Sequence, residues 1–294
     1  MSADPALKQK LDAGTFIAAP GVFDMMSLHI ANEIGFDAIF ASGYWLTASS
    51  LGLPDLGIAT YTEMLDRIVP IAATSRAPVI ADADTGYGGL LNLHRAVQGY
   101  ERAGVTAFQL EDQIFPKKCG HTPDRPVIDT EEMQRKIRVV LETRSDENFL
   151  LVARTDARTD YGLDEAIARG CAYAEAGADL VFVEALCSVE EMARVCREVP
   201  GRLLVNMAEG GVTPILTVEE LSAIGFAAAI FPAITPLAAM AAVRASLRSL
   251  KERGDSRPEG VERFSFAEMC QLLGFPEMRE LEARWRQDPP GDGR

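Results

Sequence analysis

The sequence predicts an α/β fold, a (β/α)8 TIM barrel with a C-terminal helical extension. Three observations support this prediction: eight short apolar runs recur along the chain, amphipathic segments lie between them, and charged or polar residues end most of the runs. Strands that alternate with helices pair in parallel through right-handed crossovers. Eight such units close into a barrel of about 250 residues.

The predicted strands are short runs rich in β-forming residues. They cover residues 16–24, 37–45, 78–86, 107–113, 149–157, 180–185, 202–211 and 227–234. The segments between them repeat apolar residues with the period of a helix, and several end at a glycine such as Gly104 or Gly177. An open, doubly wound sheet is the alternative, but the Gly-x-Gly-x-x-Gly fingerprint is missing after the first strand. The barrel is therefore the favoured prediction.

The chain divides into a barrel and a tail. We expect a catalytic barrel domain over residues 1–250 and a helical tail over 251–294. The tail begins with the polar stretch KERGDSRPEGVER and continues with two helical patterns, SFAEMCQLL and PEMRELEARWR. It is too short for an independent domain, so it should pack on the barrel or on a neighbouring subunit.

Charge and composition limit the partners and the compartment. The chain has 43 acidic and 29 basic residues, and its net charge of −14 repels phosphate backbones and anionic membranes. We therefore expect no nucleic-acid or membrane partner. An anionic substrate then needs a local basic feature, for which Lys117, Lys118 and His121 are candidates. No apolar run could span a bilayer, the start lacks a signal-peptide pattern, and five cysteines show no paired spacing, so we expect a cytoplasmic protein.

Polar side chains gather where the predicted strands end. Six of the eight strands end with such residues: Ser42, Asp82, Asp84, Glu111, Arg154, Asp156, Glu184, Asn206 and Glu209. One of them alone would be a solvated loop residue. The carboxyl ends of barrel strands converge on one mouth, where active sites lie, so the full set predicts an active site.

The acidic residues of this set predict a metal site. Asp82 and Asp84 are two residues apart, so they point to the same side of an extended strand, and Glu111 joins them at the mouth. Oxygen ligands without nearby histidine or cysteine favour Mg²⁺, or Mn²⁺, over Zn²⁺. Asp55 either joins this cluster through water or is a turn residue after Pro54.

Two further features concern the substrate. Arg154 offers a planar fork that fits a carboxylate, and no phosphate-cradling loop is present, so a substrate with two carboxylates fits better than a phosphate ester. The loop 114–129 is long enough to act as a lid. It carries Cys119 between positive charges, which lower the pKa of a thiol. Cys119 is either an incidental surface cysteine or an acid–base group that gives a proton to a carbanion.

The motifs KKCGH, DADTGYG, LEDQ, ARTDA and VNMAEGGVTP together resemble the isocitrate lyase and phosphoenolpyruvate mutase superfamily, in order from Pro20 to about Lys251. KKCGH resembles the signature loop of the lyase branch, whereas the phosphorus–carbon mutases lack its cysteine. The chain length resembles that of the 2-methylisocitrate and 2,3-dimethylmalate lyases. The resemblance implies a Mg²⁺-dependent carbon–carbon lyase that splits a 2-hydroxy dicarboxylate or tricarboxylate into an α-keto acid (pyruvate or glyoxylate) and a carboxylate such as succinate or propionate. It also implies a homotetramer with a swapped C-terminal helix.

The same resemblance implies roles for individual residues. For catalysis it implies Cys119 as the proton donor, with Arg154, Glu111 and His121. For the metal it implies Asp82 with Asp84, Asp55 and Glu111 around it. For substrate binding it implies Ser42, Gly43, Tyr44, Lys118, Gly120, Glu184, Asn206 and Thr213. The chain departs from the methylisocitrate lyases at one motif: it reads SGYW where their sequences are similar to SGGG. Tyr44 and Trp45 therefore either pack under the loop or face the substrate.

Two other functions remain open at this point. An oxaloacetate hydrolase would use the same acidic cluster to cleave a hydrated keto acid and release oxalate and acetate. A keto-acid-binding protein without turnover is the third possibility, but the intact KKCGH counts against it because a binding protein needs no thiol on a lid.

Overall fold

The computed structural model describes residues 3–287 and confirms the predicted (β/α)8 barrel. The eight strands are β1 (Ile17–Val22), β2 (Ile39–Ala41), β3 (Val79–Asp82), β4 (Ala107–Glu111), β5 (Leu150–Thr155), β6 (Leu180–Val183), β7 (Leu203–Asn206) and β8 (Ala228–Phe231). Each strand lies within its predicted run. The strands are shorter than the runs because most of the polar residues at the ends of the runs lie beyond the sheet.

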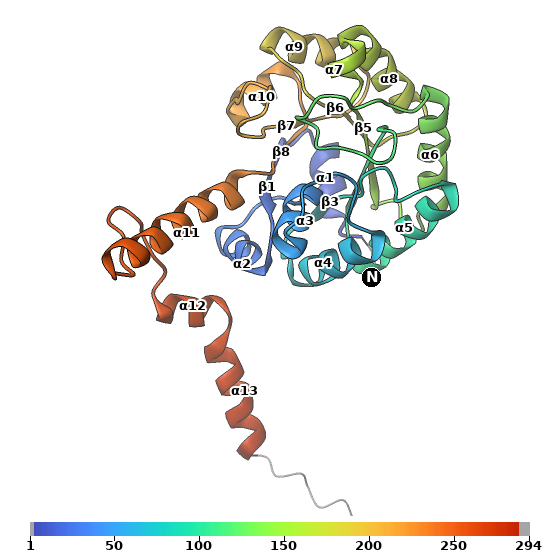
Figure 1. Ribbon diagram of the computed structural model, residues 1–294. Helices are drawn as coiled ribbons and strands as arrows, with labels where there is room; N and C mark the ends of the chain where they lie inside the picture. The colour runs from blue at the N-terminus through green and yellow to red at the C-terminus, as the bar shows by residue number, and fades with distance from the viewer. Residues whose placement is uncertain (1–2, 288–294) are drawn as a thin grey trace, which may run out of the picture. The chain divides into compact units, whose positions relative to one another are not determined.

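All eight strands are parallel and pair in sequence order, and β1 closes the barrel by pairing with β8. Ile17 lies opposite Ala228 in the closing pair, and Gly21 lies opposite Phe40 on the other edge of β1. Figure 1 shows the helices from α4 to α10 arranged around these strands. Because every strand runs the same way, all the carboxyl ends open on one mouth.

Helices fill the segments between the strands, as predicted. One helix begins at Gly43, inside the run 37–45 that was predicted as a strand, and another begins at Ala157, the last residue of the run 149–157. The helices of the barrel are α1 (Ala6–Asp12), α2 (Met25–Ile34), α3 (Gly43–Leu51), α4 (Tyr61–Thr74), α5 (Leu90–Ala103), α6 (Thr130–Thr143), α7 (Ala157–Tyr161), α8 (Leu163–Glu175), α9 (Val189–Glu198) and α10 (Val218–Ile224). Thr60 and Glu63 form a capping box that starts α4. Gly104 ends α5 in the left-handed conformation, as the glycine stop signal predicts.

The core has two layers. The inner layer fills the barrel with alternate side chains of the strands, such as Ile80, Val152 and Phe182, and it also includes Leu7 and Leu11 of α1. This short helix therefore covers the amino-terminal end of the barrel. The outer layer packs the other faces of the strands against the surrounding helices. Both faces of the strands are thus packed, which holds the mouth in a defined geometry.

The contacts divide the chain into one unit that ends at Leu237 and a second that begins at Ala238. Helix α11 (Ile234–Arg253) crosses this point, and α12 (Phe266–Leu272) and α13 (Phe275–Gln287) follow it. These helices confirm the predicted C-terminal helical extension, whereas the predicted domain boundary at residue 250 stays a prediction. Over residues 3–287 no helix has the length and apolarity that crossing a membrane requires.

Candidate active site

The mouth of the barrel contains a cavity of about 260 Å³. Most of the residues that the sequence assigns to the site line it: Ser42, Tyr44, Asp55, Asp82, Cys119, Gly120, His121, Arg154, Glu184 and Asn206. Gly43, Asp84, Glu111, Lys118 and Thr213 are not among the lining residues. Apolar residues, among them Phe40 and Ile230, separate the cavity from the packed barrel interior.

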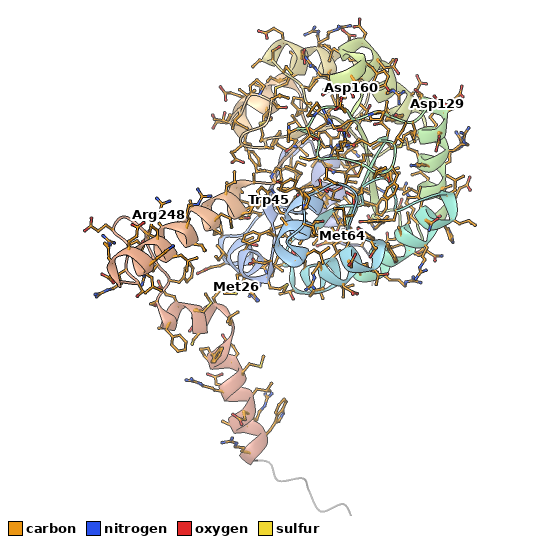
Figure 2. The ribbon with its side chains drawn as sticks, in the orientation of Figure 1. Met26, Trp45, Met64, Asp129, Asp160 and Arg248 are labelled. Carbon is orange, nitrogen blue, oxygen red and sulfur yellow. The ribbon has the colours of Figure 1, made fainter. Side chains whose placement is uncertain are left out.

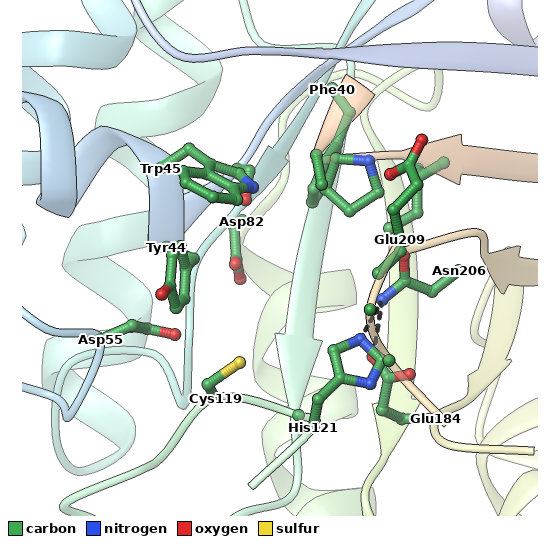
Figure 3. A pocket seen from close by; sticks show the side chains of 18 of the residues that line it. Phe40, Tyr44, Trp45, Asp55, Asp82, Cys119, His121, Glu184, Asn206 and Glu209 are labelled. Atoms are coloured by element: carbon green, nitrogen blue, oxygen red, sulfur yellow. Dashed lines mark hydrogen bonds between the residues drawn. The ribbon is translucent and has the colours of Figure 1, made fainter. Parts of the chain in front are cut away.

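Asp82, the last residue of β3, presents its carboxylate to the cavity (Figure 3). Its Oδ2 accepts a hydrogen bond from the backbone N–H of Gly43 at 3.2 Å. Its Oδ1 lies 3.2 Å from the backbone N of Asp84 and 3.4 Å from Nε2 of Gln109. A Cβ atom on Gly43 would lie 2.8 Å from Oδ2, so only glycine permits this close approach. The carboxylate is therefore held in place while one side faces the cavity.

Asp84 and Asp55 share one buried cation, the ammonium group of Lys117. Its Nζ lies 2.5 Å from Oδ1 of Asp55 and 2.6 Å from Oδ1 of Asp84. Burial raises the pKa of Asp84 to about 6, although the Lys117 charge acts against this shift. Asp84 also has a positive φ of 49°, a strained conformation for this residue type that is often found at functional sites. Lys117 is only 3% exposed, so the loop carries a fixed positive charge into the acidic cluster.

Arg154, near the end of β5, lies among three carboxylates. Its Nε lies 2.9 Å from Oδ2 of Asp156, its Nη1 lies 3.3 Å from Oε2 of Glu111, and its Nη2 lies 3.6 Å from Oε2 of Glu184. Burial alone would lower the pKa of Arg154, but Asp156 and Glu111 keep it well above its usual value. Burial raises the pKa of Glu111 well above its usual range despite Arg154. Arg154 is therefore charged and firmly oriented.

A second polar cluster joins β6, β7 and the loop. The side-chain amide of Asn206 lies 3.1 Å from Oε2 of Glu184 and 3.3 Å from Nε2 of His121. Figure 3 shows these three side chains on the side of the cavity away from Tyr44 and Asp55. A Cβ atom on Gly211 would lie 2.7 Å from the His121 ring, so the loop that follows β7 packs directly on the histidine. An amide, an imidazole and a carboxylate thus form one wall of the cavity.

The sulfur of Cys119 points into the cavity between these two sides, with Asp82 across from it (Figure 3). The predicted lowering of its pKa is wrong. Burial raises the pKa of the thiol, and the Asp55 and Glu184 carboxylates add to this shift, although a backbone N–H at His121 and the Arg154 charge act against it. The Lys117 charge is directed to Asp55 and Asp84 rather than to the sulfur. Cys119 is therefore protonated at neutral pH, which suits an acid.

The loop that carries Cys119 is attached at several points. Gln113 and Val127 form an antiparallel bridge, and Ile114 N donates to Pro126 O at 2.8 Å. The Gln113 side chain binds the backbone of Lys118 through both N–H and C=O, at 2.8 and 2.9 Å. A Cβ atom on Gly120 would collide with Nη2 of Arg154 and lie 3.0 Å from Oε2 of Glu184. The loop is thus closed over the site.

Tyr44 and Trp45 both line the cavity, with ring centroids 4.7 Å apart in an edge-to-face arrangement. Both residues belong to α3, on which Figure 2 labels Trp45. Both rings therefore border the cavity, and their contact with the substrate stays a prediction. The pair forms an aromatic wall beside Asp55 (Figure 3).

Sequence reasoning gave no specific role to two residues of the site, Gln109 and Lys117. Gln109 lines the cavity and could have been found, because it is two residues before Glu111 and shares its side of β4. Lys117 appeared only as a general basic feature, and its pairing with Asp55 and Asp84 has no local signal. Thr213 is buried, and its hydroxyl has no hydrogen-bond partner among the described residues.

The same donors allow a test of the predicted metal. Within residues 3–287, no group of three or more His, Cys, Asp or Glu side chains is arranged to hold a metal ion. Mg²⁺ needs fewer, because it keeps several waters and takes one or two carboxylates. Asp82 at the cavity wall meets that requirement, and Oε1 of buried Glu111 has no hydrogen-bond partner. The donor set therefore fits a hydrated Mg²⁺ ion.

The family model and the relatives that match this chain are consistent with one another. The phosphoenolpyruvate phosphomutase family model matches residues 7–251. A 2,3-dimethylmalate lyase of Eubacterium barkeri is 43% identical over 96% of this chain and 98% of its own. A 2-methylisocitrate lyase of Aeropyrum pernix is 39% identical over 94% of this chain and 89% of its own.

The solved structures that superpose on this chain agree with these relatives. Oxaloacetate acetylhydrolase bound to the inhibitor 3,3-difluorooxalacetate superposes with a TM-score of 0.89 at 35% identity, covering 96% of this chain and 98% of that one. A 2,3-dimethylmalate lyase of the phosphoenolpyruvate mutase and isocitrate lyase superfamily gives 0.88 at 35%, covering 97% and 96%. Phosphonopyruvate hydrolase with oxalate and Mg²⁺ gives 0.87 at 32%, covering 97% and 99%.

Proposed function

We propose that this chain, which belongs to the phosphoenolpyruvate mutase and isocitrate lyase superfamily and is a carbon–carbon lyase, cleaves a 2-hydroxy dicarboxylate or tricarboxylate of the 2-alkylmalate or 2-methylisocitrate type. The products are an α-keto acid, pyruvate or glyoxylate, and a carboxylate such as succinate or propionate. The observation that carries the proposal is the thiol of Cys119, which points into a cavity with the Asp82 carboxylate across from it (Figure 3). Burial raises the pKa of this thiol, which suits an acid.

The cofactor in this proposal is Mg²⁺, which Mn²⁺ could replace. Asp82 would hold the ion directly, with Asp84, Asp55 and Glu111 acting through its waters. When bound, the ion would stabilise negative charge on the oxygens of the keto-acid half of the substrate. The magnesium complex of the similar phosphonopyruvate hydrolase supports this choice.

The chain's own residues bind and orient the two halves of the substrate. Arg154 has its guanidinium plane fixed by Asp156 and faces the cavity, where it would bind the hydroxyl oxygen or the carboxylate beside it. The keto-acid carboxylate would lie against Ser42 and the backbone of Gly43, beside Tyr44. The other product would lie against the remaining polar residues that line the cavity: His121, Glu184 and Asn206, with Gly120 of the loop. Thr213 and Lys118, which do not line the cavity, would complete this binding site from behind these residues.

Cys119 would supply the proton that completes the reaction. Breaking the bond between C2 and C3 turns the hydroxyl-bearing carbon into the ketone and leaves an electron pair on C3, which the neighbouring carboxylate accepts as an enediolate. The hydroxyl gives its proton to a carboxylate of the site, and the Cys119 thiol gives a proton to C3. That carboxylate then loses its proton to solvent, and the Cys119 thiolate takes one up when the loop opens, so the protons balance. The closed loop keeps water away from the carbanion until this transfer occurs.

The direct test is a product assay over a substrate panel: citramalate, 2,3-dimethylmalate, 2-methylisocitrate, isocitrate and oxaloacetate, each with Mg²⁺. We expect keto-acid release from at least one of the first four. Oxaloacetate acetylhydrolase is the second candidate, because a structure of that enzyme superposes closely. Oxalate from oxaloacetate without cleavage of the others would select it. Tight pyruvate or oxalate binding without any product would instead indicate a binding protein.

The assembly we propose is a homotetramer with an exchanged C-terminal helix. Helix α11 presents an exposed apolar stripe, with Met240, Val243, Leu247 and Leu250 each at least half exposed. Phe266 on α12 is 84% exposed and Trp285 on α13 is 66% exposed. Such apolar surface usually marks a protein interface. Light scattering of the full chain and of a chain ending at residue 253 tests this, and a monomeric full chain would refute it.

A further inference from the structure

We propose that Arg125 is a positioning residue that couples the closed state of the Cys119 loop to the orientation of Arg154, with Asp156 as the link. The proposal rests on the proposed function in that Arg154 and Cys119 are its catalytic groups. Arg125 lies in the same loop, six residues beyond Cys119, and no sequence pattern marks it.

Arg125 is the largest fully buried side chain of the described residues, at 2% exposure. Its Nη1 donates to Oδ1 of Asp156, and its Nη2 donates to Oγ1 of Thr159 at 2.5 Å. Its backbone N–H donates to Oδ2 of Asp160 at 2.8 Å. Thr159 and Asp160 belong to α7, where Figure 2 labels Asp160. A loop residue is thus bound to the end of β5 and to the helix that follows.

Asp156 lies between two guanidinium groups. Oδ2 lies 2.9 Å from Nε of Arg154, and Oδ1 accepts from Nη2 of Arg154 at 2.9 Å while it also accepts from Arg125. Its backbone N–H donates to Oδ1 of Asp112 at 2.9 Å, which fixes the backbone at Asp156. One buried carboxylate therefore receives the catalytic arginine and the loop arginine together.

The loop also touches Arg154 directly. Gly120 packs so closely on Nη2 of Arg154 that no Cβ atom fits between them. Arg154 is thus in contact with the loop through Gly120 and linked to it through Asp156. If the loop opens, Asp156 loses one of its two cations and Arg154 loses its packing. Because a buried carboxylate with one partner removed is costly, the closed loop and the oriented Arg154 stabilise one another.

The test uses Arg125→Gln and compares it with Arg158→Gln. Arg158 lies on α7, next to Thr159, and forms a bidentate ion pair with Glu191 through hydrogen bonds of 3.0 and 2.6 Å. Its side chain forms no hydrogen bond with Asp156 or the loop. The first readout needs no substrate: alkylation of Cys119 by iodoacetamide, followed by mass spectrometry of the Cys119 peptide. Cys119 is on the side of the loop that faces the cavity, so its thiol reacts faster when the loop opens. We expect Arg125→Gln to raise this rate about tenfold and Arg158→Gln to leave it unchanged.

The second readout is turnover of the best substrate of the panel. We expect kcat of Arg125→Gln to fall about 10- to 100-fold with a smaller change in KM, because a misplaced catalytic group costs rate at this scale. Arg125→Lys keeps the charge and should recover part of the loss. Equal Cys119 alkylation rates in wild type and Arg125→Gln, or an equal kcat loss in Arg158→Gln, would overturn the proposal.

Thr159→Val provides a second test of the coupling in case Arg125→Gln does not fold. It removes only the hydroxyl that Nη2 of Arg125 contacts, at a residue exposed to solvent, so folding should persist. We expect a smaller rise in Cys119 alkylation, about two- to threefold. No rise in Thr159→Val and none in any folded Arg125 variant would contradict the coupling. The alkylation measurement needs no substrate. If no compound of the substrate panel were cleaved, the lyase proposal would be refuted, whereas the coupling between the loop and Arg154 would still be tested by alkylation.

Discussion

The two ends of the barrel interior are built from the same strands but contain opposite kinds of side chain. On β3, buried Ile80 is followed two residues later by Asp82 at the mouth. On β5, Val152 and Arg154 repeat this pattern. Residues two apart in a strand point to the same side, so each pair belongs to one interior column. Within each column, two residues along the strand are enough to pass from the packed core to the cavity.

This difference separates stability from function. The amino-terminal end is apolar and closed by Leu7 and Leu11, which are 1% and 5% exposed. The mouth instead contains buried charges, and burying charge costs free energy unless it is paired. The fold therefore obtains its stability at one end and carries the cost of the chemistry at the other. The predictions below test that separation, in order of decreasing effect on turnover.

Removal of the divalent ion should have the largest effect on turnover. We expect keto-acid release in excess EDTA to fall by at least about 1,000-fold, because several kcal/mol of charge stabilisation would be lost. Added Mg²⁺ or Mn²⁺ should restore it. Undiminished turnover by protein shown to be metal-free by elemental analysis would remove the metal from the account.

Arg154→Lys should have the next largest effect. A lysine keeps the charge but cannot contact Asp156 and the substrate with a planar fork. We expect kcat/KM to fall about 100-fold, or ~2.7 kcal/mol. Arg144→Lys is the matched control, because Arg144 pairs with Asp179 at 2.6 Å just before β5, at the other end of the barrel. The account fails here if both variants lose the same activity.

The pH profile should show a smaller, graded effect. Cys119 must be protonated to act as an acid, so the rate should fall as pH rises through its pKa, about tenfold per unit above it. Burial raises that pKa, so the fall should begin above the ordinary thiol value of about 8.5. Initial rates between pH 6 and about 10 measure this. A decline centred near neutral pH would show that the thiol is not held protonated.

A substitution at the closed end should leave turnover unchanged. Leu7→Ala removes a buried side chain of α1 and should lower the free energy of unfolding by about 2–4 kcal/mol. We expect kcat to stay the same, because α1 covers the end of the barrel opposite the mouth. Denaturant unfolding and steady-state kinetics on one preparation measure both quantities. A large loss of kcat in folded Leu7→Ala would contradict the separation of the two ends.

The sequence predicted the barrel and most of the cavity because both depend on short-range patterns. Alternating strands and helices predict the fold, and polar residues at strand ends predict the mouth, since the carboxyl ends of parallel strands must meet. Asp82, Arg154 and Glu184 were found in this way. Gln109 obeys the same two-residue spacing and was missed only because a neutral amide is less conspicuous than a charge.

The electrostatics of the loop could not be predicted, because they depend on where a 16-residue segment lies after folding. The two lysines beside Cys119 indicated a lowered pKa, but the Lys117 side chain turns away to Asp55 and Asp84. Burial and nearby carboxylates then raise the pKa. Arg125 likewise meets Asp156 only through the fold, 31 residues along the chain. Sequence neighbours do not determine the charge around a loop residue.

The most direct measurement is the turnover of Cys119→Ser, a change of one atom at the sulfur that faces the cavity, with the exposed thiol variant Cys187→Ser as its control. The account predicts that kcat falls by at least about 100-fold in Cys119→Ser, while pyruvate or oxalate still binds and Cys187→Ser keeps its full rate. Full turnover by Cys119→Ser would contradict the assignment of this thiol as the acid that completes carbon–carbon cleavage.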